Sequence, residues 1–409
     1  MEVRYPKRIF YVNRQMFEAN YSKLSDRLSG QEGGAWDVHD RALVMEREGK
    51  DVILLCVGDP DFRTPQPIID NAVSYLRVGR THYSPTLGEI KLRRAVADLE
   101  TQTSSHPCTA DEVAIFPGAT NALHAVMSCL LDPGDEVIVP EPMYVGYPPI
   151  MSSIDAVLVA VPLLVEDDFA LDMAAIKAAV NTRTRVVFVN TPGNPTGSII
   201  SGAELAELAE FCRQKNLWLV CDEVYSMFTY EGGHRSLRAS VEHLENVVMV
   251  DGLSKSHAMS GWRVGWVVAP EALITRLGEY AGATLFGCPQ FIQDASAFAL
   301  ENDQEYVQRM RKEYRQRCDL VLKRLEKLDG LHCHRPKAGM FVMCDVGATG
   351  MSGNEFANRL LDAEKVSVVP GDAFGPTAAS CVRIGLAQPP PVLKRACKRI
   401  KRFIEALPA

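Results

Sequence analysis

The sequence lacks an excess of positive charge, and this absence limits the partners that the protein can have. Its 44 lysine and arginine residues are outnumbered by 51 aspartate and glutamate residues, which gives a net charge of −7. Proteins that bind nucleic acids or anionic membranes usually carry basic patches that attract phosphate groups. We therefore expect no nucleic-acid partner and no membrane partner, and we expect small-molecule substrates instead.

Long apolar runs and a recognisable signal peptide are also absent. The N-terminal residues are basic and aromatic without an apolar core, and no later stretch is long enough to cross a bilayer. The 11 cysteines are odd in number and contain no C-x-x-C pair. Scattered cysteines in apolar segments are typical of reduced, buried thiols. We expect a cytoplasmic protein that is not exported.

Short apolar segments alternate regularly with helical patterns from about residue 111 onwards. This alternation predicts an α/β fold with a mostly parallel, seven-stranded sheet that is covered on both faces. No candidate strand is followed by G-x-G-x-x-G, which argues against a nicotinamide-dependent dehydrogenase. The candidate strands are residues 113–116, 136–139, 156–161, 185–189, 217–221, 247–250 and 264–268.

A shorter and more mixed alternation towards the C-terminus predicts a second, smaller α+β domain. We expect residues 21–61 and 297–409 to form this domain and residues 62–296 to form the large one. Residues 291–328, which span the boundary between the two expected domains, should form one long helix or two joined helices. Residues 1–20 show no clear period, so we expect either an arm across another subunit or a disordered segment.

A lysine stands among small hydroxyl residues just after a candidate strand ends. Lys255 lies between Ser254 and Ser256, and Arg263 follows in the same segment. Most lysines are solvated surface cations, which is the simpler interpretation. A desolvated lysine beside another cation, however, has a lowered pKa and can form a Schiff base as a free amine. Because Ser254 and Arg263 would bind an anion beside it, the segment suggests a phosphorylated aldehyde cofactor, of which pyridoxal 5′-phosphate is the common one.

Other strand ends carry groups that suit such a cofactor, although each has a simpler explanation. Gly118, Ala119 and Thr120 begin a helix, where N–H groups and a hydroxyl bind an anion or merely cap the helix. Gly58 lets the backbone approach a ligand closely, or only makes a turn. Tyr144 could stack on an aromatic ring, or pack in an interface.

Polar residues also stand within or just after apolar strands. Asp222 ends such a strand and, when buried, needs a cationic partner such as a protonated pyridine nitrogen; the alternative is a capping aspartate. Tyr225 follows one turn later, and Asn194 lies in a proline-rich turn. The guanidinium of Arg383 would fit the carboxylate of an amino acid, or form a buried salt bridge.

Taken in order, these motifs resemble those of fold-type I, class I and II aminotransferases. The resemblance rests on Ser254-Lys255 followed by G-x-R-x-G, on the N-P-T-G turn at residues 194–197 and on D-E-V-Y at residues 222–225. It extends from about residue 30 to the end of the chain. It implies a homodimer with active sites at the subunit interface, which uses pyridoxal phosphate to move an amino group from an L-amino acid to a 2-keto acid.

The same resemblance implies a role for each residue. Lys255 would hold the cofactor as an aldimine and move the Cα proton, while Asp222 would pair with the pyridine nitrogen. Tyr225 and Asn194 would contact the phenolate oxygen, and Arg383 would bind the substrate carboxylate. The other expected cofactor-binding residues are Gly118, Ala119, Thr120, Tyr144, Ser254, Arg263 and, at the phosphate of the neighbouring subunit's cofactor, Tyr83, whereas Gly58 and Asn194 are expected to bind substrate.

Three segments, residues 34–39, 141–145 and 253–259, resemble a narrower bacterial group, the arginine–pyruvate transaminases. Trp36 and Asp37 begin the helix before Gly58, in a segment that closes over the substrate's distal end in this family. An indole and a carboxylate would suit a guanidinium by stacking and by a charge-assisted bond, but Asp37 could equally stabilise its own helix N-terminus. We expect arginine or a similar cationic amino acid as donor, with pyruvate as acceptor.

Other functions stay open at this point. An aspartate- or aromatic-type aminotransferase would share the same cofactor residues, and so would an enzyme that catalyses β-elimination, racemisation or ring formation. A regulatory cofactor-binding module is less well supported, because no DNA-reading helix pair is present. We expect no bound metal.

Overall fold

The larger part of the chain forms a seven-stranded sheet. The computed structural model describes residues 21–29, 36–104, 106–230, 233–302 and 304–407, so the expected arm at residues 1–20 lies outside the described residues. The strand order is β2-β8-β7-β6-β5-β3-β4, and only β8 runs antiparallel to its neighbours. The strands are β2 (Val113–Phe116), β3 (Glu136–Glu141), β4 (Val157–Pro162), β5 (Thr184–Asn190), β6 (Trp218–Asp222), β7 (Val247–Gly252) and β8 (Gly265–Val268). The predicted seven-stranded, mostly parallel sheet is therefore confirmed.

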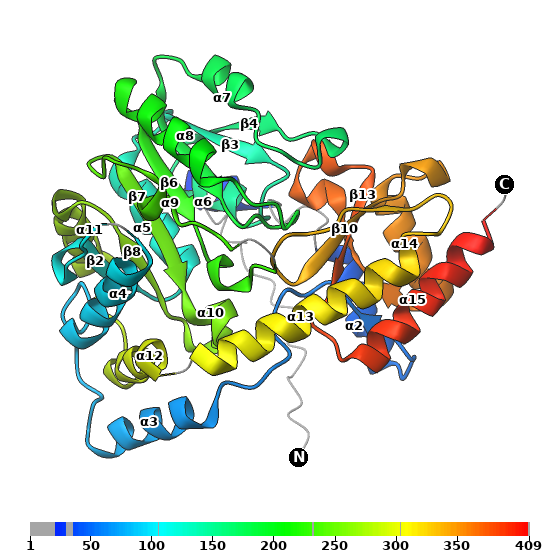
Figure 1. Cartoon of the computed structure of the whole chain (residues 1–409), viewed down its shortest axis with the longest axis horizontal. Coiled ribbons are helices and arrows are strands. Elements are labelled where there is room, and N and C mark those ends of the chain that lie inside the picture. The colour runs from blue at the N-terminus through cyan, green and yellow to red at the C-terminus, as the bar shows by residue number, and fades with distance from the viewer. Residues whose placement is uncertain (1–20, 30–35, 105, 231–232, 303, 408–409) are drawn as a thin grey trace, which may run out of the picture.

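Both faces of this sheet are covered by helices (Figure 1). Alternate residues of one strand belong to different hydrophobic clusters; Val187 of β5, for example, packs on one face and Phe188 on the other. This is why the strands appear in the sequence as continuous apolar segments. One face carries α3 (Gln66–Arg77), α4 (Ile90–Thr103), α7 (Met173–Ala179), α8 (Gly202–Gln214), α9 (Leu237–Ser240) and α12 (Gln290–Asn302), and the other carries α5 (Ala119–Leu130), α6 (Tyr147–Ser153) and α11 (Glu271–Thr284).

A smaller four-stranded antiparallel sheet, with the order β12-β13-β10-β9, lies beside the large one (Figure 1). Helices α2, α13, α14 and α15 share its hydrophobic cluster. The elements are α2 (Asp37–Arg47), β9 (His332–Cys333), β10 (Phe341–Asp345), α14 (Gly353–Glu364), β12 (Val369–Pro370), β13 (Cys381–Gly385) and α15 (Pro390–Glu405), with a separate parallel pair of β1 (Ile53–Leu54) and β11 (Val366–Ser367). The C-terminal part thus has the mixed α+β character that the sequence predicts.

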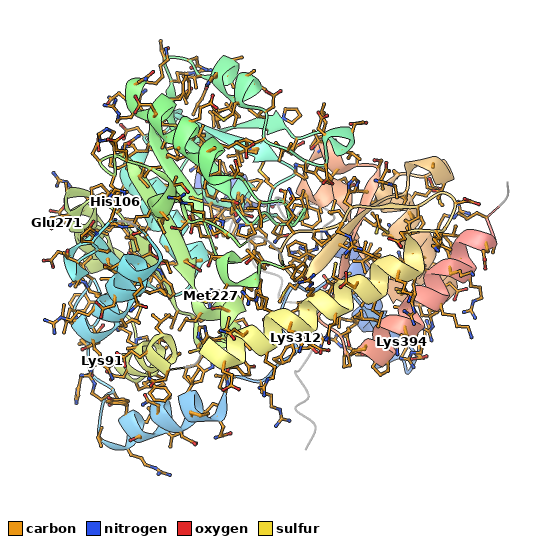
Figure 2. The ribbon with its side chains drawn as sticks, viewed as in Figure 1. Lys91, His106, Met227, Glu271, Lys312 and Lys394 are labelled. Atoms are coloured by element: carbon orange, nitrogen blue, oxygen red, sulfur yellow. The ribbon has the colours of Figure 1, made fainter. Side chains whose placement is uncertain are left out.

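The long C-terminal helical region is divided into α12 and α13 (Gln304–Leu325). Buried residues of α12 pack with the large sheet, and those of α13 pack with the small one. Side chains of α13 and α15 such as Lys312 and Lys394 point outward (Figure 2). The domain boundaries given above stay a prediction. The change from packing on the large sheet to packing on the small sheet occurs between α12 and α13, a few residues after the predicted boundary at residue 297.

A membrane-crossing helix is not found in the described part of the chain, since no helix there combines the necessary length and apolarity.

Candidate active site

A cavity of about 480 Å³ lies where the carboxyl ends of the parallel strands meet the small domain. Ligands of open α/β sheets commonly bind at this edge. Both the large sheet and the small domain contribute to the wall. Of the predicted site residues, those in the wall are Trp36, Gly58, Ala119, Thr120, Tyr144, Asn194, Asp222, Tyr225, Ser254, Lys255, Arg263 and Arg383.

The amine of Lys255 projects from α10 (Leu253–Ser256), the short helix that follows β7. Its Nζ donates a hydrogen bond of 2.7 Å to the carbonyl oxygen of Gly58. Burial lowers the pKa of Lys255 to about 8; the carboxylate of Asp59 opposes this shift, and the guanidinium groups of Arg383 and Arg263 add to it. At neutral pH about one-tenth of Lys255 is therefore a free amine, far more than for an ordinary lysine. The free amine is the form that attacks an aldehyde.

The carboxylate of Asp222 ends β6 and is 4% exposed. Its Oδ2 accepts a hydrogen bond of 2.9 Å from the Tyr147 phenol, and its Oδ1 accepts one of 3.1 Å from the Val224 N–H. Burial raises the pKa of Asp222 to about 6, while these two hydrogen bonds and the charge of Lys255 oppose the shift. A cation placed beside this carboxylate would favour its ionised form.

The start of α5 and the Arg263 segment approach each other closely. A Cβ atom at Gly118, where φ is +90°, would lie 2.3 Å from Nη2 of Arg263. A Cβ atom at Gly265 would lie 2.4 Å from the Ala119 backbone nitrogen. Only glycine permits this approach, which brings the guanidinium beside the start of α5, and Thr120 lines the same cavity as Arg263. Together these groups can bind an anion such as a phosphate.

The guanidinium of Arg383 is 6% exposed and lies between two aromatic rings. It is centred 5.3 Å from the ring of Phe341 and 4.9 Å from that of Phe374. Nη1 donates to Oδ1 of Asn194 at 2.9 Å, and Nη2 donates to the Cys56 carbonyl at 2.8 Å. Its Nε has no hydrogen-bond partner among the described residues, and burial lowers its pKa. A buried cation without a carboxylate partner suits a carboxylate substrate.

Three predicted site residues do not line the cavity. Gly118 is in contact with the guanidinium of Arg263, and a larger residue at this position would displace that guanidinium. Asp37 is exposed in the first turn of α2. Tyr83 is 81% exposed, and its ring meets that of Phe286 edge to face at 5.1 Å.

Sequence analysis missed several residues that organise the cavity. The Asn190 side chain donates to the Asp222 carbonyl at 2.9 Å and accepts from the Asn194 N–H at 2.8 Å, so it joins the end of β6 to the Asn194 turn. Tyr147 and Asp59 also line the wall. Tyr144 and Tyr147 are three residues apart at the start of a helix, a spacing that places two side chains on the same face, so Tyr147 could have been predicted to lie beside Tyr144. Nothing in the sequence distinguishes Asn190 from any residue that ends a strand.

These residues fit pyridoxal 5′-phosphate by their chemistry. The wall combines a lysine with a lowered pKa, a buried carboxylate, and an anion site built from Thr120, Ser254 and Arg263. They would hold the aldehyde, the pyridine nitrogen and the phosphate, respectively. Across the ranges that the structure describes, no group of three or more His, Cys, Asp or Glu side chains is arranged to hold a metal ion.

Comparison with known proteins gives a consistent result. The family model described as aminotransferase class I and II matches residues 50–400. The chain is 44% identical to the arginine–pyruvate transaminase of Pseudomonas aeruginosa over 93% of its own length and 97% of that protein, and 37% identical to the aspartate aminotransferase of Pyrococcus abyssi over 87% and 92%. Among solved structures, the aspartate aminotransferase of Thermus thermophilus with maleate superposes with a TM-score of 0.89 at 32% identity, covering 94% of this chain and 100% of the other.

Proposed function

The chain belongs to the class I and II aminotransferases, and we propose that within this family it moves the amino group of arginine, or of another long cationic L-amino acid, to pyruvate. The fold-type I architecture, the transaminase activity and the dependence on pyridoxal 5′-phosphate are those expected from the sequence, and the family match and the similar proteins confirm them. The observation that carries the activity is the placement of Lys255, Asp222 and Arg383 in one cavity wall.

We further propose how these residues divide the work. When bound, the cofactor provides an electron sink that stabilises negative charge at the substrate Cα. Arg383 binds the substrate carboxylate through its fork and so fixes which Cα bond faces Lys255. Lys255, whose pKa burial lowers to about 8, would in its free-amine form accept the Cα proton and return it at the cofactor carbon. Asp222 would pair in its ionised form with the pyridine nitrogen and keep that nitrogen protonated, and Asn194 and Tyr225 would hydrogen-bond the phenolate oxygen.

A homodimer with shared active sites is part of the proposal. Tyr83 and Phe286 form an exposed aromatic pair, 81% and 58% exposed, that does not touch this chain's own cavity. An exposed aromatic pair of this kind suits burial by a second copy. In the dimer, Tyr83 would reach the phosphate site of the neighbouring subunit. We also propose a cytoplasmic location, which the 11 free cysteines support.

The preference for arginine rests on the similar transaminase from Pseudomonas aeruginosa and on the position of Trp36. The Trp36 indole lines the cavity at the N-terminus of α2 and can stack on a guanidinium. Asp37 is the next residue, but it is exposed in the first turn of α2 and is not part of the cavity wall. The two neighbours can therefore be tested separately.

A donor screen tests this proposal. Each amino acid is mixed with the loaded enzyme, and conversion of the bound cofactor to its amine form is followed by absorbance. We expect arginine to react faster than aspartate or phenylalanine. Trp36→Ala should weaken arginine turnover by about one order of magnitude and leave alanine turnover nearly unchanged, if a contact of about 1–2 kcal/mol is lost, whereas Asp37→Ala, outside the wall, should change neither turnover appreciably. Equal losses for both donors would refute a role in side-chain recognition, and fastest reaction with aspartate would favour an aspartate-type enzyme.

A further inference from the structure

Two cysteines face each other across the edge of the small sheet. Cys333 of β9 is paired directly with Cys344 of β10 in the antiparallel register. Their sulfur atoms lie 2.8 Å apart. That separation is about 0.8 Å longer than a disulfide bond of about 2.0 Å.

The backbone at this pair also suits a disulfide. The adjoining pair, His334 and Met343, is hydrogen-bonded, because the His334 N–H donates to the Met343 carbonyl at 2.8 Å. Hydrogen-bonded and non-hydrogen-bonded pairs alternate along an antiparallel ladder, so Cys333 and Cys344 form a non-hydrogen-bonded pair. Cα atoms of such pairs are about 4.5 Å apart, which lies within the range of about 4.4–6.8 Å found in disulfides.

We propose that Cys333 and Cys344 are a redox modification site, at which a mild oxidant such as hydrogen peroxide joins the two sulfurs in a reversible disulfide. Strand β9 is the last strand of its sheet, and Cys333 is partly exposed, so an oxidant reaches it. Cys344 is fully buried, and burial raises the pKa of its thiol well above the ordinary value. The two thiols therefore have different parts in the reaction.

The reaction balances with peroxide as the only oxidant. The Cys333 thiolate attacks one peroxide oxygen and becomes a sulfenic acid, and hydroxide leaves with the other oxygen. The Cys344 sulfur then attacks the Cys333 sulfur, the S–S bond forms, and the sulfenic hydroxyl leaves as water after taking a proton. In total, two thiols and one peroxide give one disulfide and two waters. A small thiol reverses the step by exchange.

The disulfide would close the base of a hairpin whose tip contacts the turn at residues 194–197, which carries Asn194. The Lys337 N–H, in the loop between β9 and β10, donates to the Gly197 carbonyl at 2.9 Å. A Cβ atom at Gly197 would lie 2.4 Å from Cβ of Pro336, so the loop packs tightly on the turn that carries Asn194. A covalent bond at the base of this hairpin restrains the segment through which the small sheet touches that turn.

The test uses the holoenzyme treated with stoichiometric hydrogen peroxide and then digested without reduction. We expect the free thiols titrated in denaturant to fall from 11 to nine, and the mass spectrum to show one linked pair of peptides, containing Cys333 and Cys344. Amide hydrogen exchange should slow in residues 334–343. The melting temperature should rise by about 2–4 °C and fall back after reduction, as expected for a short loop closed in a chain of this size.

The variant Cys333→Ser removes the exposed partner and should keep its ten thiols under the same treatment. Cys108→Ser, which removes a partly exposed thiol far from the pair in sequence, is the matched control and should lose two thiols as the wild type does. A wild-type enzyme that keeps all 11 thiols would overturn the proposal. So would a link from Cys344 to Cys397 or Cys381, the thiols that also influence the Cys344 pKa.

Discussion

The Tyr147 hydroxyl lies 2.9 Å from Oδ2 of Asp222, and both side chains are almost completely buried in the wall of the cavity. Tyr147 begins α6, whereas Asp222 ends β6, so the bond joins a helix start to a strand end 75 residues away. The Tyr147 ring is itself held edge to face by Phe188 and Tyr144, at 4.5 and 5.4 Å between ring centroids. The orientation of Asp222 therefore depends on an aromatic cluster behind it.

Tyr147→Phe removes this hydrogen bond without changing the packing. Because the bond favours ionised Asp222, its loss raises the pKa of that carboxyl, and the acid limb of the rate profile should move to higher pH. We expect kcat at neutral pH to fall about ten- to hundredfold, the effect of losing a bond to a charged group. Tyr314→Phe, which removes a similar bond to Asp61 outside the cavity, should leave the position of the acid limb unchanged. An unmoved limb in Tyr147→Phe would argue against the positioning role.

Asp222→Asn should retain the cofactor but slow removal of the Cα proton severely. A neutral amide cannot keep the pyridine nitrogen protonated, and a buried ion pair that loses one partner costs about 3–5 kcal/mol. This corresponds to a loss of about two to four orders of magnitude in rate. Single-turnover absorbance measurements with a deuterated and a protiated donor check this directly. A near-normal rate would exclude the assigned role of Asp222.

Lys255→Ala should bind the cofactor without a covalent bond. Borohydride treatment followed by mass spectrometry should label the wild type on Lys255 and leave the variant unlabelled. Because the pKa of Lys255 is lowered to about 8, covalent capture of cofactor by the wild-type apoenzyme should quicken as pH rises and reach half its maximum near that value. Labelling of another lysine in wild type would contradict the assignment.

Arg383→Lys should raise the half-saturating concentration of every amino acid, since an ammonium cannot reproduce the planar fork that grips a carboxylate. An increase of about ten- to hundredfold corresponds to the loss of a charge-assisted bond. Arg317→Lys, at another buried arginine, is a suitable control because Arg317 pairs with Asp61 outside the cavity. If only one class of donor is affected, Arg383 recognises the distal side chain instead.

Glu100→Gln should make stability less dependent on pH. Burial, with some help from Glu223, raises the pKa of Glu100 to about 8, and the cation of Arg238 opposes the shift. Below about pH 4.5 Glu100 is protonated in both the folded and the unfolded chain. Above it the unfolded chain releases the proton first, so the contribution of Glu100 to the free energy of unfolding declines by about 1.4 kcal/mol per pH unit until about pH 8. The variant should therefore gain melting temperature relative to wild type between pH 5 and about 8. A difference in melting temperature between variant and wild type that stays constant from pH 5 to 8 would contradict this.

The elements of the large sheet could be predicted because each strand is apolar on both faces and is bounded by turns. The segments 113–116 and 247–250, for example, appear in the structure as β2 and β7 with at most two residues of difference. The apolar segment at residues 52–57 has the pattern of a strand over its whole length, but only Ile53 and Leu54 are paired as strand, with the equally short β11. A short parallel pair depends on its distant partner, which local periodicity does not report.

The sequence by itself determined the family, the cofactor chemistry and the order of the motifs, because Lys255, Asp222 and Arg383 stand in local contexts whose chemistry can be recognised without coordinates. Tertiary structure decided which side chains meet. Asn190, Tyr147 and Asp59 gain their roles from contacts between distant segments, and Cys333 meets Cys344 only through the register of a hairpin. The physical reason is that a hydrogen bond or a pKa shift depends on distances of a few ångströms, which the packing of the whole chain sets, whereas a motif depends on neighbours along the backbone.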